Sequence, residues 1–263
     1  MNELNSAVLK RKLEFHYRNF DRSKISPDPL EFPHRFQDYN DIEISAFISS
    51  IFAYGNIKQI ITILEKIHSS INNQPFQFLK SYDRKKGRET FENTFFRFYS
   101  TNDIVVLFKV LRNIYDENGS IKNFFMKCYL NSGESIKEAI TCFSKKIIKM
   151  MHSYTEVTHG IKFMFPFPNK NSTCKRINLF LRWMVRKDEL DFGLWSEIPK
   201  SKLIIPVDTH IARIAKQLEL TNQKNISWKM AVEITENLRK LDPNDPVKYD
   251  FALCHIGMRK MSF

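Results

Sequence analysis

The chain has 263 residues, of which 43% are hydrophobic, including 23 Phe. That length and composition allow one large domain or two small lobes with a sizeable core, and they exclude a disordered chain. Lys and Arg total 41 against 29 Asp and Glu, so the net charge of +12 favours a polyanionic partner, either nucleic acid or an acidic membrane surface, without choosing between them.

The predicted elements, in chain order, are helices almost throughout. Residues 3–19 form a surface amphipathic helix that contains no apolar signal core. Three prolines within residues 27–33 predict a connection without regular helix. Asn40 and Glu43 then have the spacing of a capping box, which begins a deeply buried helix that ends at Gly55.

The middle of the chain continues as helices. Ile57, Ile60, Ile61 and Leu64 share one side of the next amphipathic helix. The basic segment 80–93 is either a solvated loop, which we favour, or a surface that binds a nucleic-acid backbone. Further helices fit residues 102–116, 120–130 and 134–151, with Gly119 and Gly133 between them.

The C-terminal third begins with the turn-rich segment FMFPFPNKNST and the strongly amphipathic helix CKRINLFLRWMVR. The apolar run LIIPV leads into a helix after Asp208, and further helices fit residues 227–241 and the segment from Pro246. No run of alternating strands and no fixed-period repeat is present. We expect an all-α protein with a middle lobe of residues 40–160 and a terminal lobe of residues 1–39 plus 161–263.

The four cysteines, Cys128, Cys142, Cys174 and Cys254, contain no C-x-x-C pair and no dense framework of the secreted type. This spacing excludes a compact four-cysteine iron–sulfur site. We expect free thiols in a reducing cytoplasm, and no metal or cofactor. No stretch reaches the ~18 apolar residues that a membrane span needs.

Lys175 is the first residue of chemical interest. Ser172 or Thr173 is a natural N-cap, which places Lys175 in the first turn of its helix. The helix dipole disfavours a positive charge there, so the position suits a lysine that must lose its proton and attack an electrophile. An exposed lysine tolerated at a helix start is the competing interpretation.

Asp208 is the second such residue. It is well placed to cap the helix that begins at Thr209, and capping alone explains an Asp there. The apolar residues that precede it should be buried, however, and a carboxylate emerging from an apolar wall is where a functional charge would be placed. The two roles are compatible.

The segment PVDTHIARIAKQLEL resembles the VDTH segment of the endonuclease III and helix-hairpin-helix DNA glycosylase superfamily. Lys175 precedes Asp208 by 33 residues, a separation similar to that of archaeal 8-oxoguanine DNA glycosylase (AGOG). The segments AFISSIFAYGN, CKRINLFLRWMVR and YDFALCHIG also resemble AGOG. The chain resembles still more closely, over nearly its whole length, a bacterial family related to AGOG.

This resemblance implies a two-lobed helical fold with a cleft between the lobes, and a DNA repair glycosylase and AP lyase that excises an oxidised purine, with 8-oxoguanine favoured. Lys175 would be the nucleophile, Asp208 the activating carboxylate and Asp250 a residue that contacts the base. The expected partner is double-stranded DNA containing a damaged base. We expect a monomer at the nucleoid, in the cytoplasm, without a membrane partner.

Excision requires a base pocket and contacts to the DNA backbone. For the pocket the candidates are Tyr54, Phe165, Phe167 and Trp195, although core packing is the competing interpretation for each. For the backbone the candidates are Lys170, Arg176, His210 and Arg213.

The chain departs from the family in two respects. The hairpin PFPNKNSTCK lacks the Gly-x-Gly turn, so we expect Asn169 or Asn171 to adopt the left-handed conformation instead. The aromatic residues that sandwich the base in AGOG have no clear match, and Cys254 stands where one is expected. Two alternatives therefore stay open: a non-catalytic DNA- or RNA-binding helix-hairpin-helix protein, and a helical adaptor that binds other proteins.

Overall fold

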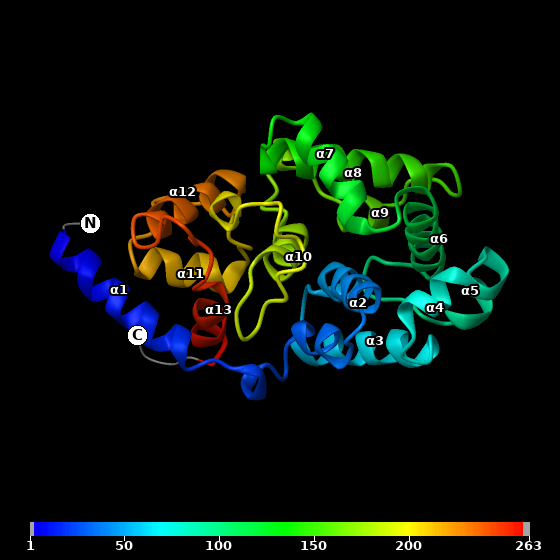
Figure 1. The fold of residues 1–263 in the computed structure, drawn as a ribbon, viewed down its shortest axis with the longest axis horizontal. Coiled ribbons are helices and arrows are strands. Elements are labelled where there is room, and N and C mark those ends of the chain that lie inside the picture. Colours follow the sequence, from blue (N-terminus) through cyan, green and yellow to red (C-terminus); the bar gives the residue numbers. More distant parts are fainter. Residues whose placement is uncertain (1–2, 260–263) are drawn as a thin grey trace. The chain divides into compact units, whose positions relative to one another are not determined.

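The chain is all-α in the computed structural model, which describes residues 3–259 (Figure 1). Within these residues the extended pairing is limited to two isolated β-bridges, Phe96–Tyr99 and Lys187–Phe192. The prediction of an all-helical chain is thus confirmed. No helix of the described part combines the length and the apolar character that crossing a bilayer would require.

The helices belong to two compact units. Unit 1 comprises Met1–Ser26 and Pro168–Phe263, and unit 2 comprises Pro27–Phe167. Residues 27–39 and 161–167, which the sequence analysis assigned to the terminal lobe, therefore belong to the unit formed by the middle of the chain. Each unit is described separately below.

Unit 2 contains eight α-helices, two of which, α7 and α8, pack against each other. Its helices are α2 (Tyr39–Phe52), α3 (Ile57–Ser70), α4 (Pro75–Lys80), α5 (Arg84–Thr90), α6 (Thr101–Asn118), α7 (Ile121–Asn131), α8 (Ile136–His152) and α9 (His159–Met164). The Pro-rich connection forms the 3₁₀ turns Pro29–Glu31 and Pro33–Arg35, each with proline in its first turn.

The buried helix α2 begins two residues earlier than expected, and the predicted capping box is wrong. Asp38 is the N-cap, and its carboxylate accepts from the backbone N–H groups of Asn40 and Asp41. Glu43 is instead fully buried and accepts hydrogen bonds from residues distant in sequence. Its Oε2 accepts from the Ile121 backbone N–H at 2.7 Å, so it neutralises the N-terminus of α7.

Two further predictions for unit 2 are wrong. The buried side of α3 consists of Ile60, Ile63, Leu64 and Ile67, because the helix is rotated relative to the predicted stripe, and Ile57 and Ile61 are only half-buried. The favoured loop at 80–93 contains helix α5. Gly87 permits this helix, since a Cβ there would lie 2.0 Å from the Tyr82 hydroxyl oxygen.

The thiol prediction fails for two of the four cysteines. Cys128 of α7 and Cys142 of α8 form a disulfide, with Cα atoms 5.7 Å apart. Cys174 and Cys254 remain thiols outside any disulfide, as expected. Sequence spacing did not indicate the pair because the turn between α7 and α8 brings the two residues together.

Unit 1 contains five α-helices within the described residues, and α11 packs against α13. They are α1 (Glu3–Arg18), α10 (Lys175–Val185), α11 (Thr209–Gln217), α12 (Trp228–Arg239) and α13 (Asp250–Arg259), with 3₁₀ turns at Arg22–Lys24, Pro168–Lys170 and Lys200–Lys202. The last helix begins at Asp250 and not at Pro246, which lies in the preceding turn.

Candidate active site

Helix α10 presents Lys175 as its first residue. The N-cap is Cys174, in the left-handed conformation with φ of 49°, and it makes no side-chain capping bond. The prediction that Ser172 or Thr173 caps the helix is therefore wrong, although the placement of Lys175 in the first turn is confirmed. Asn171 adopts the left-handed conformation with φ of 63°, as expected for one of the two hairpin asparagines.

Asp208 is the N-cap of α11, as predicted. Its Oδ1 accepts from the backbone N–H groups of His210 at 2.9 Å and Ile211 at 3.0 Å. The preceding residues Ile205 and Val207 are buried, so the carboxylate is anchored at the edge of an apolar segment. One carboxylate oxygen is thus occupied by the helix.

The other oxygen of Asp208 faces Lys175. The distance between Lys175 Nζ and Asp208 Oδ2 is 3.0 Å, and the two side chains are 29% and 20% exposed. Both residues come from helix N-termini in unit 1 and remain accessible to solvent. The geometry brings together the amine and the carboxylate that the sequence analysis paired.

The electrostatics of Asp208 favour its ionised form. Burial acts to raise the pKa of its carboxyl, but the ammonium of Lys175 and the Ile211 N–H outweigh burial, and the pKa is lowered. His210 lowers it further. In the free protein the Asp208 carboxylate is therefore ionised and forms an ion pair with Lys175.

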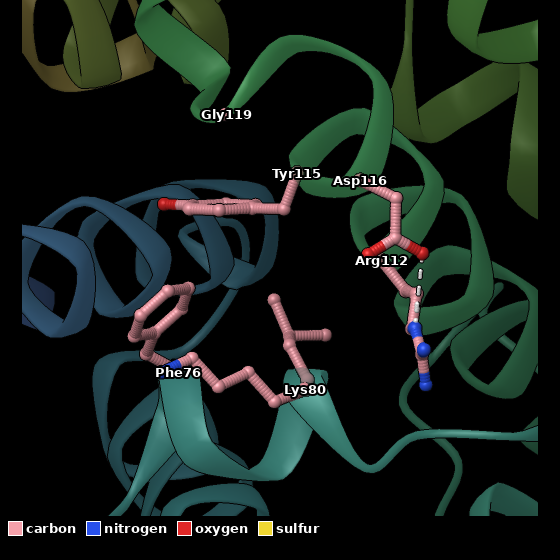
Figure 2. A pocket seen from close by; sticks show the side chains of 7 residues that line it. Phe76, Lys80, Arg112, Tyr115, Asp116 and Gly119 are labelled. Atoms are coloured by element: carbon pink, nitrogen blue, oxygen red, sulfur yellow. Dashed lines mark hydrogen bonds and ion pairs between the residues drawn. The ribbon is translucent and has the colours of Figure 1, made fainter.

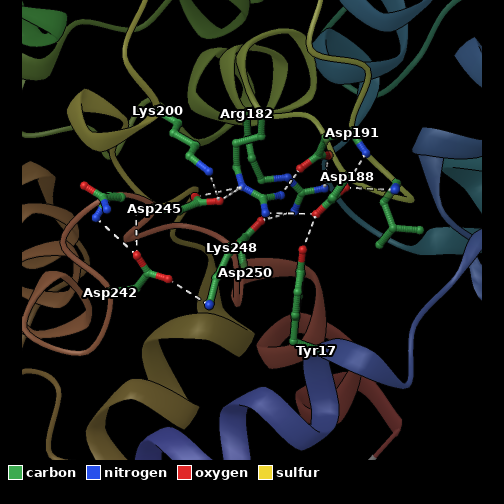
Figure 3. Close-up of polar contacts among 12 residues, drawn as sticks. Tyr17, Arg182, Asp188, Asp191, Lys200, Asp242, Asp245, Lys248 and Asp250 are labelled. Atoms are coloured by element: carbon green, nitrogen blue, oxygen red, sulfur yellow. Dashed lines mark hydrogen bonds and ion pairs between the residues drawn. The ribbon is translucent and has the colours of Figure 1, made fainter.

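Unit 1 also contains a cluster of buried ion pairs (Figure 3). Arg182 of α10 joins Asp250 to Asp191, and Arg186 one turn later joins Asp191 to Asp245. Such a cluster ties α10 to α13 and to the loop after α12. The signal that could have revealed it is the pair of arginines inside the apolar helix sequence FLRWMVR.

Asp250, the predicted base contact, belongs to this cluster. It is buried, and its Oδ2 accepts from Arg182 Nη1. Burial raises the pKa of Asp250 to about 6, Arg182 acts in the opposite direction, and the charges of Asp208 and Asp191 add to the increase. Asp250 and Asp208 therefore repel each other electrostatically within unit 1.

Two of the four base-pocket candidates are core residues. Trp195 is fully buried in unit 1, with its ring edge-to-face against Phe180 at 5.1 Å. Phe165 is fully buried in unit 2, where it stacks on Phe47 at 6.3 Å. Both are packed as the competing interpretation, core packing, expects. Tyr54 and Phe167 are half-buried residues of unit 2.

The four candidates for contacts to the DNA backbone differ in the exposure of their side chains. Arg176 is 7% exposed, so its side chain belongs to the interior of unit 1 and not to its surface. Lys170, His210 and Arg213 are exposed. His210 and Arg213 are three residues apart on α11, so they lie on the same side of the helix that Asp208 caps.

A hollow in unit 2 of about 240 Å³ involves none of the predicted site residues (Figure 2). Phe76 and Lys80 of α4 face Arg112 and Tyr115 of α6 across it. Lys80 Nζ lies 4.4 Å from the Phe76 ring centre, and Arg112 Nε donates to Asp116 at 3.1 Å. The cations of this hollow therefore have local partners already.

Within residues 3–259 no group of three or more His, Cys, Asp or Glu side chains could hold a metal ion. Residues 28–259 match DUF2400, described as a protein of unknown function. No curated protein and no solved structure matches the chain.

Proposed function

The chain belongs to the DUF2400 family, and we propose that it is a DNA glycosylase and AP lyase in which Lys175 is the nucleophile and Asp208 its activating carboxylate. The observation that carries the proposal is the 3.0 Å approach of Lys175 Nζ to Asp208 Oδ2 at two helix N-termini, with both groups accessible. This arrangement supplies the two groups that amine-based cleavage of an N-glycosidic bond requires.

The proposed chemistry begins with a proton transfer. The Lys175 ammonium gives its proton to the Asp208 carboxylate as the extruded nucleoside enters, and the neutral amine attacks C1′ of the sugar. The C1′–N bond breaks, and the base leaves with the bonding electrons and takes the proton that Asp208 received. The attacking nitrogen then loses a proton, the C1′–O4′ bond breaks and O4′ takes up that proton, which leaves a protonated Schiff base between Lys175 and C1′. Loss of a C2′ proton then expels the 3′ phosphate, and water releases the lysine.

The charge distribution supports DNA as the substrate. Unit 1 contains 23 of the 41 Lys and Arg but only 14 of the 29 Asp and Glu. The exposed His210 and Arg213 stand beside Asp208 on α11, where they can contact phosphates. The helix N-terminus itself is occupied by the Asp208 carboxylate, so phosphate binding rests on side chains.

The finer parts of the proposal come from the resemblance. They are a two-lobed helix-hairpin-helix fold with a cleft between the lobes, an oxidised purine as the excised base with 8-oxoguanine favoured, and action as a monomer at the nucleoid. A crystal structure with lesion-containing DNA tests the fold. A panel of duplexes with different lesions tests the base.

The decisive experiment is trapping with borohydride, which reduces a Schiff base to a stable covalent adduct. Wild-type protein incubated with duplexes that contain 8-oxoguanine or an abasic site is expected to give a protein–DNA band on a denaturing gel. Lys175→Gln should abolish the band and leave DNA binding intact. Asp208→Asn should slow base release.

Lys229→Gln is the matched control, because Lys229 is also an exposed lysine in the first turn of a unit 1 helix. It should trap as well as the wild type. Absence of an adduct with wild-type protein, on every lesion and on abasic sites, would reject the mechanism. Trapping by Lys175→Gln would assign the chemistry to another amine.

The burial of Phe165 and Trp195 favours a second candidate function, a non-catalytic DNA- or RNA-binding protein on the same scaffold. Without exposed rings from these residues, a flipped base would have fewer stacking partners. This alternative predicts salt-sensitive binding with neither base release nor trapping. The same gels, with binding measured at two salt concentrations, distinguish it from the enzyme.

A further inference from the structure

A tight turn between α5 and α6 exposes two phenylalanines in unit 2. Phe96 and Tyr99 form a β-bridge with N–O distances of 2.9 and 2.8 Å, which leaves Arg97 and Phe98 at the tip. Phe95 is 70% exposed and Phe98 is 48% exposed. Hydrophobic side chains with such exposure on one turn indicate a binding surface.

The turn is held in place from two sides. The Tyr54 hydroxyl donates to the Phe96 carbonyl at 3.2 Å and accepts from the Phe98 N–H at 3.3 Å. On the other side, the backbone of α9 packs on the Phe98 carbonyl so closely that a Cβ at Gly160 would lie 2.3 Å from that oxygen. The exposed rings therefore stand on a rigid base.

Phe98 belongs to an aromatic cluster. Its ring lies parallel to Tyr54 with an interplanar angle of 9°, and edge-to-face with Phe163 at 5.1 Å and His159 at 4.9 Å. These contacts fix the ring plane while nearly half of the side chain stays in solvent. A pre-oriented ring loses little conformational entropy when a flat partner stacks on it.

Arg97 adds a positive charge to the same tip. Its backbone is in the left-handed region with φ of 54°, a conformation that non-glycine residues seldom adopt. The guanidinium lies 5.3 Å from the centre of the Tyr54 ring. Strained backbone that fixes a cation beside exposed rings is typical of a functional surface.

We propose that Phe95, Arg97 and Phe98 form a stacking platform that binds the unpaired bases of single-stranded DNA. Exposed aromatic rings combined with a cation complement the two parts of a DNA strand, since bases stack on rings and phosphates pair with arginine. The net charge of +12 favours this polyanion over a neutral or basic protein partner. The choice of DNA as the partner rests on the proposed function. The stacking of bases on exposed rings does not depend on glycosylase or lyase activity.

The test compares two probes of equal length and charge by fluorescence anisotropy. One is a labelled oligothymidine, and the other is a strand of tetrahydrofuran residues, which has phosphates but no bases and cannot form a Schiff base. The wild type should bind the thymidine strand at least five-fold more tightly, as stacking of even one base requires. Phe98→Leu and Phe95→Leu should each reduce that preference and leave binding of the base-free strand unchanged.

Phe15→Leu is the matched control, since Phe15 is 64% exposed on α1 of unit 1, and it should keep the full preference. Melting curves followed by circular dichroism identify any variant that fails to fold. Because Phe98→Leu and Phe95→Leu are independent substitutions, the inference can still be tested with one of them if the other does not fold. The inference is overturned if the wild type binds both strands equally, binds neither, or loses nothing in the folded Phe98→Leu and Phe95→Leu variants.

The Lys175→Gln variant separates this inference from the proposed function. It should retain the preference for bases while it loses borohydride trapping. Base-dependent binding without any trapping in the wild type would leave the platform standing and reject the enzyme. Trapping without base-dependent binding would support the enzyme and reject the platform.

Discussion

Asp250→Asn is expected to stabilise the protein at neutral pH, even though Asp250 is ion-paired. The reason is a shortage of positive charge in the buried cluster of unit 1. Two arginines, one in α10 and one immediately after it, face four aspartates, and each arginine is shared between at least two of them (Figure 3). Lys200, whose side chain is exposed, adds only one further cation at 3.6 Å from Asp245. The residues are Arg182 and Arg186 on one side and Asp188, Asp191, Asp245 and Asp250 on the other. Burial without full neutralisation favours a carboxyl that keeps its proton.

The magnitude follows from the pKa of Asp250, which burial raises from 3.8 to about 6. A carboxyl with a higher pKa in the folded chain than in the unfolded chain binds more protons when folded. Its contribution to stability is therefore complete below about pH 3.8 and is lost as the pH rises through 6. The free energy of unfolding that wild-type protein forfeits by pH 7 is about 3 kcal/mol, at 1.36 kcal/mol for each pH unit.

Urea unfolding of wild type and Asp250→Asn between pH 4 and pH 7 measures this term directly. Carboxyls whose pKa values are lowered by other groups, such as Glu14 beside Lys248 and Tyr249, act in the opposite direction, but they are common to both proteins and cancel in the difference. Asp250→Asn should be the more stable protein at pH 7, and its advantage should shrink steadily toward pH 4. An advantage that does not vary with pH, or a variant less stable by several kcal/mol at pH 7, would refute the charge-shortage argument.

One substitution and one chemical reduction test the packing of unit 2. Glu43→Ala should lower the free energy of unfolding by about 3 kcal/mol, because it leaves the buried Ile121 N–H and Tyr115 hydroxyl without their acceptor, and an unchanged urea midpoint would contradict this. Reducing the disulfide that joins Cys128 to Cys142, 14 residues apart, should lower the stability by about 3 kcal/mol. Melting with and without dithiothreitol measures that loss, and the double alanine variant should show no response to the reductant.

The parts of the fold that were predictable from sequence are those set by local patterns. The apolar residues of α10 and α11 recur every three or four positions, which is enough to predict a helix with one buried side. Asp208 caps its helix through N–H groups only two and three residues away. The pairing of Lys175 with Asp208 was found in the same way, from two helix starts and a resemblance. Local information was sufficient there because both groups act at the ends of regular elements.

The features that local patterns did not reveal depend on contacts distant in sequence. Glu43 has the spacing of a cap, but the N-terminus that it neutralises belongs to α7, 78 residues away. Trp195 was available in sequence for a base pocket, and only the packing of Phe180 against it shows that it fills the core. The aromatic turn was not identified at all, because exposure of Phe98 depends on α9 lying against its backbone.

The position of Lys175 is hard to explain by stability alone. An ion pair between groups 29% and 20% exposed contributes at most about 1 kcal/mol. Against this, a positive charge in the first turn opposes the dipole of α10 by about 0.3–1 kcal/mol. Asp208 caps α11 through Oδ1 alone, so the cap does not require the lysine that its Oδ2 holds. Because the pair stabilises the fold so little, an amine held 3.0 Å from a fixed carboxylate supports the proposal that the two groups act together on a substrate.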